Sequence, residues 1–214
     1  MNKSLYSLIL SDGVIREIDR LAYKSGTNRS GMINQILAEY VSYTTPEMRI
    51  SQIFSSLENL LSGGDDFKLL INNSASVMNL RSSLDYKYNP SVRYAVELYK
   101  TDNENIGEMK VSLRTQSAAL ISYMMEFYKA FASLESARVK NVEYYLEGDR
   151  FVRKLKLRKE GVDAEALGSI IADYIKMFDS CLKAFFYNID SIQRASYEVD
   201  RILCEYLETR GAII

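Results

Sequence analysis

The chain has 214 residues, of which 47% are hydrophobic and 26% are charged, the balance of an ordinary globular protein. No apolar run is long enough to span a membrane, and the stretch from Leu5 to Leu10 is too short for a secretory signal. We therefore expect a cytoplasmic protein without membrane contact. Histidine is absent, as are a phosphate-binding glycine loop and a nucleophile-elbow motif, so we expect no enzyme, no cofactor and no metal site.

The chain carries nearly equal numbers of basic and acidic side chains, so its net charge does not indicate a nucleic-acid partner. The net charge is −1, from 27 basic and 28 acidic side chains, and residues 1–50 carry six basic against five acidic ones. A protein that neutralises many phosphates usually has a local basic excess. A nucleic-acid partner must therefore be inferred from pattern rather than from charge.

The first predicted element is a strand from Ser4 to Leu10. Its alternation separates two faces, one with Tyr6, Leu8 and Leu10 and the other with Leu5, Ser7 and Ile9. Because a lone edge strand leaves its backbone groups unpaired, this strand requires a partner.

Two short amphipathic helices are predicted next. Ser11 and Asp12 can cap the first, and Gly26 ends it. Asn28 or Ser30 can cap the second, whose apolar face consists of Met32, Ile33, Ile36, Leu37, Tyr40 and Val41. A piece of about 40 residues cannot bury an adequate core alone. We therefore expect an intertwined homodimer, in which the strand pairs with its copy and four helices share one core.

The segment from Ser11 to Tyr40, SDGVIREIDRLAYKSGTNRSGMINQILAEY, resembles the Arc/MetJ/CopG ribbon-helix-helix family. It has that family's first helix and glycine turn, and its second helix begins with a polar, a basic and a serine residue, here Asn28, Arg29 and Ser30. The resemblance covers roughly the first quarter of the chain and implies a homodimer that binds double-stranded DNA.

The resemblance also implies two sets of DNA contacts. Paired strands enter the major groove, where outward side chains contact base edges; here these are Leu5, Ser7 and Ile9, with Lys3 just before them. The start of the second helix holds a phosphate through free N–H groups and the helix dipole. On this chain that phosphate clamp consists of Asn28, Arg29 and Ser30.

The base-facing strand is more apolar than is usual in the family, and two interpretations remain open. Leu5 and Ile9 could contact thymine methyl groups, which discriminate little between bases. Alternatively, both strand faces are buried, and the domain serves dimerisation or protein contact.

The rest of the chain predicts a linker helix over 46–64, beginning at Pro46, and an α+β domain over 65–214. Alternating apolar positions predict strands over 77–88, 92–98 and 109–113, a polar loop over 101–107, and an edge strand over 67–71. Such alternation is typical of an antiparallel meander with one packed and one wet face. The wet face would carry Arg81, Asp85, Lys87, Arg93, Glu97, Lys110 and Arg114, either as a solvated surface or as a ligand- or partner-binding one.

Long helices complete the predicted domain. One is expected over 116–138, followed by a hairpin turn at 147–149 and a strand over 151–157. That segment is the most basic of the chain and indicates either stray surface charges or a second phosphate contact, through Arg150, Arg153, Lys154, Lys156, Arg158 and Lys159. From Asp163 to about Glu208 the pattern predicts one helix or two abutting ones, apolar on two sides. We expect one side to contact the sheet and the other a second copy of the chain.

The expected domains are 1–45, 46–64 and 65–214, and we weigh three function hypotheses for them. The first is a ribbon-helix-helix transcriptional regulator, homodimeric or of higher order, or a partition or mobilisation protein of a plasmid or mobile element with the same chemistry. Its C-terminal domain would serve oligomerisation, sensing or partner contact. The second is a structural or adaptor protein that uses the module for dimerisation alone. An antitoxin is a third option, but antitoxin tails often fold only on binding, whereas this C-terminal part predicts its own fold.

Overall fold

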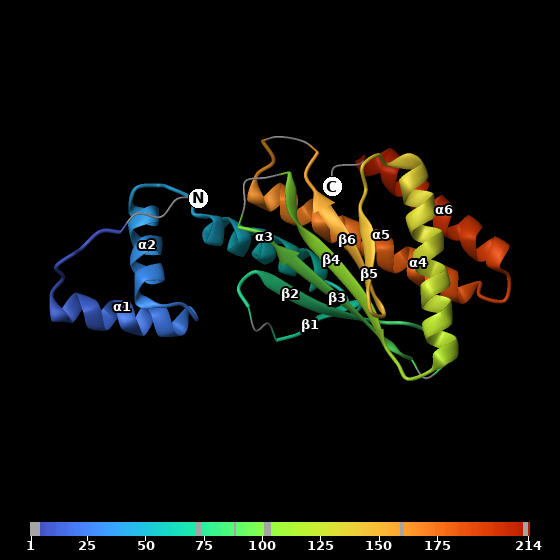
Figure 1. Cartoon of the computed structure of the whole chain (residues 1–214), viewed down its shortest axis with the longest axis horizontal. Coiled ribbons are helices and arrows are strands. Elements are labelled where there is room, and N and C mark those ends of the chain that lie inside the picture. Colours follow the sequence, from blue (N-terminus) through green and yellow to red (C-terminus); the bar gives the residue numbers. More distant parts are fainter. Residues whose placement is uncertain (1–4, 72–73, 88, 101–103, 159–160, 212–213) are drawn as a thin grey trace. The chain divides into compact units, whose positions relative to one another are not determined.

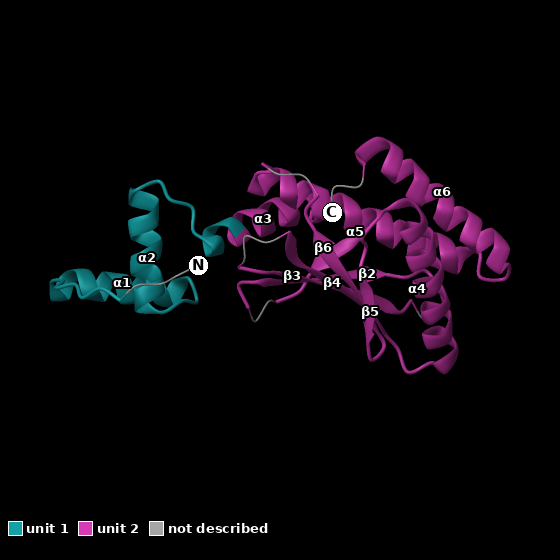
Figure 2. Ribbon diagram, turned by 45° about the horizontal axis from the view of Figure 1, so that its top comes forward, with its two compact units in different colours: residues 1–49 teal, residues 50–214 magenta. Residues whose placement is uncertain are grey.

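The computed structural model describes residues 5–71, 74–87, 89–100, 104–158, 161–211 and 214 (Figure 1). The chain divides into two compact units, residues 1–49 and 50–214 (Figure 2). The first unit contains helices α1 (Asp12–Lys24) and α2 (Arg29–Tyr40) and the first residues of α3 (Pro46–Leu61). Both predicted short helices are therefore present.

Helix α3 begins at the predicted proline, whose fixed φ suits the first helical position. The Thr45 hydroxyl accepts a hydrogen bond from the Met48 N–H at 3.2 Å and so caps the helix. From Ile50 onward its buried side chains belong to the core of the second unit.

The second unit is built on a six-stranded antiparallel sheet in the order β1-β2-β3-β4-β6-β5. Its strands are β1 (Phe67–Leu69), β2 (Val77–Ser83), β3 (Ser91–Leu98), β4 (Asn105–Arg114), β5 (Tyr144–Glu147) and β6 (Arg150–Lys156). The predicted α+β class and antiparallel meander are confirmed. The predicted hairpin turn is also present, because Glu147 pairs with Arg150 around Gly148, whose φ is +66°.

Two strand boundaries differ from the prediction. Strand β4 begins at Asn105, inside the expected loop, because a register shift between Asn105 and Gly107 lets it continue its pairing with β6. Strand β2 ends at Ser83, so Asp85 and Lys87 lie beyond the sheet rather than on its wet face. The last position of that predicted strand, residue 88, lies outside the described residues.

Helices α4 (Ala118–Arg138), α5 (Ala164–Tyr187) and α6 (Ile192–Arg210) complete the unit, and Figure 1 shows α5 crossing behind the strands. Inward side chains of the sheet pack against α4 and α5 around Phe178, which is fully buried. The Phe178 ring contacts Tyr94 and Phe151 of the sheet. The same ring contacts Phe127 and Phe131 of α4.

The long C-terminal segment forms two helices, which selects between the predicted alternatives. Helix α5 ends at Tyr187, and the Ser191 side chain accepts from the Arg194 N–H to start α6. The expectation that a second copy covers the other side of α5 is wrong. That side packs on α6 of the same chain, where Ala195, Val199 and Leu203 are buried. Folding the segment back at 188–191 buries both apolar sides within one chain.

Candidate functional site

The first unit is a helix pair with a very small core. The Gly26 backbone, at φ +59°, turns the chain between α1 and α2, as the sequence predicts. One apolar cluster joins the two helices and consists of Ile18, Ala22 and Met32, with Leu10 and Ile33 packed partly against it. The burial of so few apolar side chains offsets little of the conformational entropy that the unit loses on folding.

The predicted phosphate clamp lies at the start of α2. The Asn28 side chain accepts a hydrogen bond from the Gly31 N–H at 2.8 Å, which makes Asn28 the N-cap. Among the described residues, the backbone N–H groups of Arg29 and Ser30 have no acceptor. The helix thus presents two free donors and the positive end of its dipole at this point.

The Arg29 side chain has a partner within the chain. Its guanidinium donates two hydrogen bonds to the Asp19 carboxylate of α1, at 2.7 and 2.6 Å. The hydrogen bond from Arg29 lowers the pKa of Asp19, and the same bond raises the pKa of Arg29. Both side chains remain about half exposed, so the pair also joins α1 to α2 at the surface. Sequence reasoning identified the position of Arg29 but not this contact.

The strand predicted over Ser4 to Leu10 is not formed in the single chain. Residues 5–10 have no strand structure, and Leu5, Ser7 and Ile9 are exposed. Lys3, the fourth predicted base-facing residue, lies outside the described residues. The physical reason is that a strand takes its hydrogen bonds from a neighbour, and no described segment pairs with residues 5–10. The base-facing side chains are therefore not arranged as a site by the single chain.

A large unpartnered apolar surface distinguishes the first unit. Leu5 is 99% and Ile9 is 103% exposed relative to an isolated residue. Further large apolar side chains are exposed on the helices and after α2, namely Val14, Leu21, Tyr23, Ile36, Leu37, Tyr40 and Val41. Scattered exposed apolar residues are normal on a monomer, but a concentration of this size in about 40 residues marks an interaction surface.

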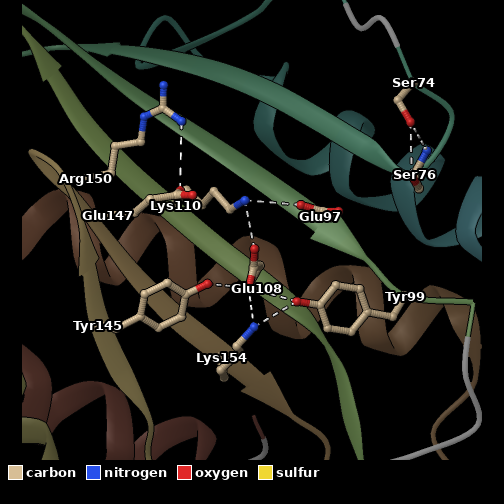
Figure 3. A network of polar contacts seen from close by, with 10 residues as sticks. All are labelled: Ser74, Ser76, Glu97, Tyr99, Glu108, Lys110, Tyr145, Glu147, Arg150 and Lys154. Carbon is tan, nitrogen blue, oxygen red and sulfur yellow. Dashed lines mark hydrogen bonds and ion pairs between the residues drawn. The ribbon is translucent and has the colours of Figure 1, made fainter.

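The second polar feature of the molecule is the Glu108 cluster on the open face of the sheet, formed by Glu97, Tyr99, Glu108, Lys110, Tyr145 and Lys154 (Figure 3). Glu108, only 5% exposed, accepts from Lys110 at 2.8 Å and also from Lys154. Hydroxyl groups of Tyr99 and Tyr145 donate to the same carboxylate at 2.8 and 2.9 Å. Lys110 also reaches Glu97 at 3.3 Å, so two carboxylates neutralise two ammonium groups.

The contacts at Glu108 hold this carboxylate and the groups bonded to it in their ordinary charge states at neutral pH. Burial opposes ionisation of Glu108, but hydrogen bonds from Lys110 and Lys154, and then from the two tyrosines, lower its pKa to about 2. The hydrogen bond to Glu108 raises the pKa of Lys154, and burial raises the pKa of Tyr99. General acid–base catalysis needs a group that titrates near the working pH, and these shifts move the groups away from it. The cluster instead ties β3, β4, β5 and β6 together.

A third polar cluster is buried and contains Arg153, one residue of the predicted basic segment. The Arg153 side chain points into the core, where its guanidinium donates to Glu135 of α4 at 2.8 Å and to the Ile214 carbonyl at 3.0 Å. Tyr174 donates to the same carboxylate at 3.0 Å, and Tyr144 donates to it as well. Arg153 is 1% exposed and therefore unavailable to a phosphate. The alternation of β6 places it with Phe151 and Leu155, which is the sequence signal for its burial.

Sequence reasoning missed Glu108 and Tyr145 altogether. Both act through neighbours on other strands, and only the pairing of β4 with β6 and of β6 with β5 brings them together. Within the described ranges, no Cys, Asp and Glu side chains gather in a group that could hold a metal ion. No helix of the described part of the chain is both long and apolar enough to cross a membrane.

Comparison with protein-family models, with curated proteins and with solved structures finds no match for this chain. The ribbon-helix-helix resemblance therefore depends on the residues from Ser11 to Tyr40 and on the two helices that they form.

Proposed function

We propose that this protein is a DNA-binding regulator whose first unit completes its fold as an intertwined homodimer. The observation that carries the proposal is the exposed apolar surface of residues 5–41, which far exceeds the small cluster that the unit buries. Pairing residues 5–10 with the same residues of a second chain would satisfy their backbone groups. It would also bring the apolar side chains of two α2 helices together.

The start of α2 supports DNA as the ligand. Two free N–H groups and the helix dipole favour a phosphate there. The Arg29 pair with Asp19 is exposed, and exposed ion pairs contribute little and are screened by salt. A phosphate offers Arg29 the same bidentate geometry as a carboxylate, so the backbone of DNA can replace Asp19 as its acceptor.

The adaptor alternative is favoured by two observations at the same site. Leu5 and Ile9 offer no hydrogen bond to a base edge, and Asp19 competes for Arg29. In that case the first unit dimerises but does not bind DNA. The dimer is common to both functions, and only DNA binding separates them.

The oligomeric state is tested first, by light scattering on the eluted full chain. The double variant Leu5→Asp/Ile9→Asp is expected to be monomeric where the unaltered chain is dimeric. Ile71→Asp is the matched control, because Ile71 is 94% exposed but lies in the second unit, and it should leave the dimer intact. A monomeric unaltered chain at micromolar concentration contradicts the proposed dimer.

DNA binding is tested with random-sequence duplex DNA over a series of salt concentrations. Affinity should fall steeply with salt, and Arg29→Ala and Asn28→Ala should weaken it further. Arg20→Ala is the control, since Arg20 is an exposed arginine of the same unit paired with Glu17. A dimer that does not bind DNA even at low salt supports the adaptor instead.

A further inference from the structure

A second feature of the open sheet face is a row of positive side chains across neighbouring strands, here called the cationic row. Lys68 of β1 lies opposite Arg81 of β2, and Arg81 lies opposite Arg93 of β3. Arg93 in turn lies opposite Ser112 of β4, and Arg114 follows two residues along. Ser112, Arg114 and Arg150 of β6 line one shallow depression together with Arg93, Leu113 and Asp149. All five cationic side chains are exposed.

The cationic row is not neutralised by the chain itself. Among the described residues, Lys68, Arg81, Arg93 and Arg114 have no ion pair and no side-chain hydrogen bond. Arg150 has a long contact with Glu147, at 4.0 Å, and Asp149 is the acidic residue of the depression. Four residues further along β3 and β4 on the same face, the carboxylates of Glu97 and Glu108 neutralise the ammonium groups of Lys110 and Lys154. The cationic row and the Glu108 cluster therefore share one sheet face and differ in whether acidic side chains accompany the basic ones.

Like charges directly opposite each other on neighbouring strands destabilise a sheet. Lys68, Arg81 and Arg93 are three such residues in succession. Glu97 and Glu108 also lie directly opposite each other, but the ammonium group of Lys110 pairs with both carboxylates. Within the described residues, no acidic side chain pairs in this way with Lys68, Arg81 or Arg93. An anionic ligand that bridges the row removes this repulsion, because its charges lie between the cations.

The spacing and the surroundings indicate a repeating anion. Neighbouring strands are about 4.8 Å apart, so a row from β1 to β6 covers roughly 19 Å. Protein partners usually anchor on tryptophan, tyrosine and arginine side chains that fill well-packed, desolvated pockets. Arg93, Arg114 and Arg150 of the cationic row line only a shallow depression, and no exposed large apolar side chain of the described chain lies on the outward positions of the row. The aromatic groups of this face, Tyr99 and Tyr145, are held by Glu108.

We propose that the cationic row binds the phosphate backbone of a nucleic acid, without reading its bases. This site lies wholly within the second unit and is separate from the predicted clamp at Asn28 to Ser30. It goes beyond the proposed function, because it needs neither the dimer nor the ribbon.

The test uses the full chain and the double variant Arg81→Gln/Arg93→Gln. The matched control is Lys129→Gln/Lys176→Gln, which removes the same charge from exposed positions of α4 and α5. Binding to random-sequence duplex and single-stranded DNA is measured at several salt concentrations. Each lost phosphate contact lowers the slope of log affinity against log salt by about 0.9 for duplex and about 0.7 for single strands. We expect a decrease of about 1.8 or 1.4 in the row variant, and none in the control.

A folding readout accompanies the binding assay. Removing like charges should leave the midpoint of thermal unfolding unchanged or raise it, so a loss of affinity cannot be attributed to unfolding. A lower midpoint together with unchanged affinity contradicts the proposal. So does a row variant whose salt slope equals that of the control.

Two further arms separate the cationic row from the clamp and from an acidic-peptide site. Combining the row variant with Arg29→Ala distinguishes the row from the clamp. If Arg29→Ala alone has no effect while the row variant weakens binding, the clamp fails and the cationic row stands. Polyglutamate serves as an acidic protein probe of similar charge density. If it competes as well as DNA at equal charge concentration, the row is an acidic-peptide site and the nucleic-acid assignment is overturned.

Discussion

Replacing Glu108 by glutamine would test the energetics of the open sheet face directly. The variant keeps the shape of the side chain and an acceptor for Tyr99 and Tyr145, but removes the negative charge that Lys110 and Lys154 share. Both ammonium groups lie on the same side of the sheet, and Lys154 would lose its only ion pair within the described residues. We expect the second unit to lose stability while keeping its fold.

The magnitude follows from the pKa of Glu108. Its value of about 2 in the folded chain, against an ordinary 4.5, corresponds to about 3 kcal/mol of preferential stabilisation of the carboxylate. Because the glutamine retains part of the hydrogen bonding, we expect Glu108→Gln to cost about 2–3 kcal/mol at neutral pH. For a unit of this size that corresponds to a fall of roughly 5–10 °C in the unfolding midpoint.

The pH dependence provides the sharper test, and its sign is fixed by the depressed pKa. Above pH 4.5 the carboxylate is ionised in both the folded and the unfolded chain, and its stabilisation is complete. As the pH falls from about 4.5 to about 2, the unfolded chain takes up the proton first, so the contribution is lost. The free-energy difference between the unaltered chain and Glu108→Gln should therefore shrink over this window, as measured by urea unfolding at each pH.

Glu143→Gln is the matched control for this experiment. Glu143 pairs with Lys156 on the same sheet, but its side chain is 59% exposed, so we expect a cost of at most about 1 kcal/mol. A Glu108 variant as stable as the Glu143 variant at pH 7 would refute the reasoning. So would a difference between the unaltered chain and Glu108→Gln that stays constant between pH 5 and pH 2.

Three further substitutions probe the core and the sheet by the same unfolding measurement. Phe178→Ala removes a fully buried ring and should cost about 3–5 kcal/mol; a loss below 1 kcal/mol would mean that the aromatic cluster does not organise the core. Glu135→Gln leaves the buried Arg153 charge without its partner and should cost about 3–5 kcal/mol, a prediction that an unchanged midpoint contradicts. Gly107→Ala would place a methyl group 2.1 Å from the Glu97 carbonyl oxygen and should cost about 1–3 kcal/mol or more, whereas Gly64→Ala, with open space around it, should be nearly neutral.

Alternation and helical period predicted much of the second unit. Apolar residues at every second position place Val92, Tyr94, Val96 and Leu98 on the packed face of β3, and all four are buried. The same reasoning assigned Arg81, Arg93, Glu97, Lys110 and Arg114 to the open face, where the strand register places them. A side-chain period of two fixes the face of each residue before any partner strand is known.

The same patterns could not determine which strands are neighbours. Strand β6 lies between β4 and β5, and this order alone joins Glu108 to Lys154 and Tyr145. Pairing between strands distant in sequence depends on how all faces are buried at once. The sequence could therefore supply the charges of the open face but not separate the neutral Glu108 cluster from the cationic row.

The sequence by itself determined the helices, most strands of the second unit with the faces of their residues, and the apolar surplus of residues 5–41, since these depend on local spacing. The tertiary structure decided that α6, and not a second copy, covers α5, and that Asp19 holds Arg29. It also showed that residues 5–10 form no strand within one chain. These outcomes depend on contacts between distant segments or between molecules. The residue pattern of a single segment does not determine the free energies of such contacts.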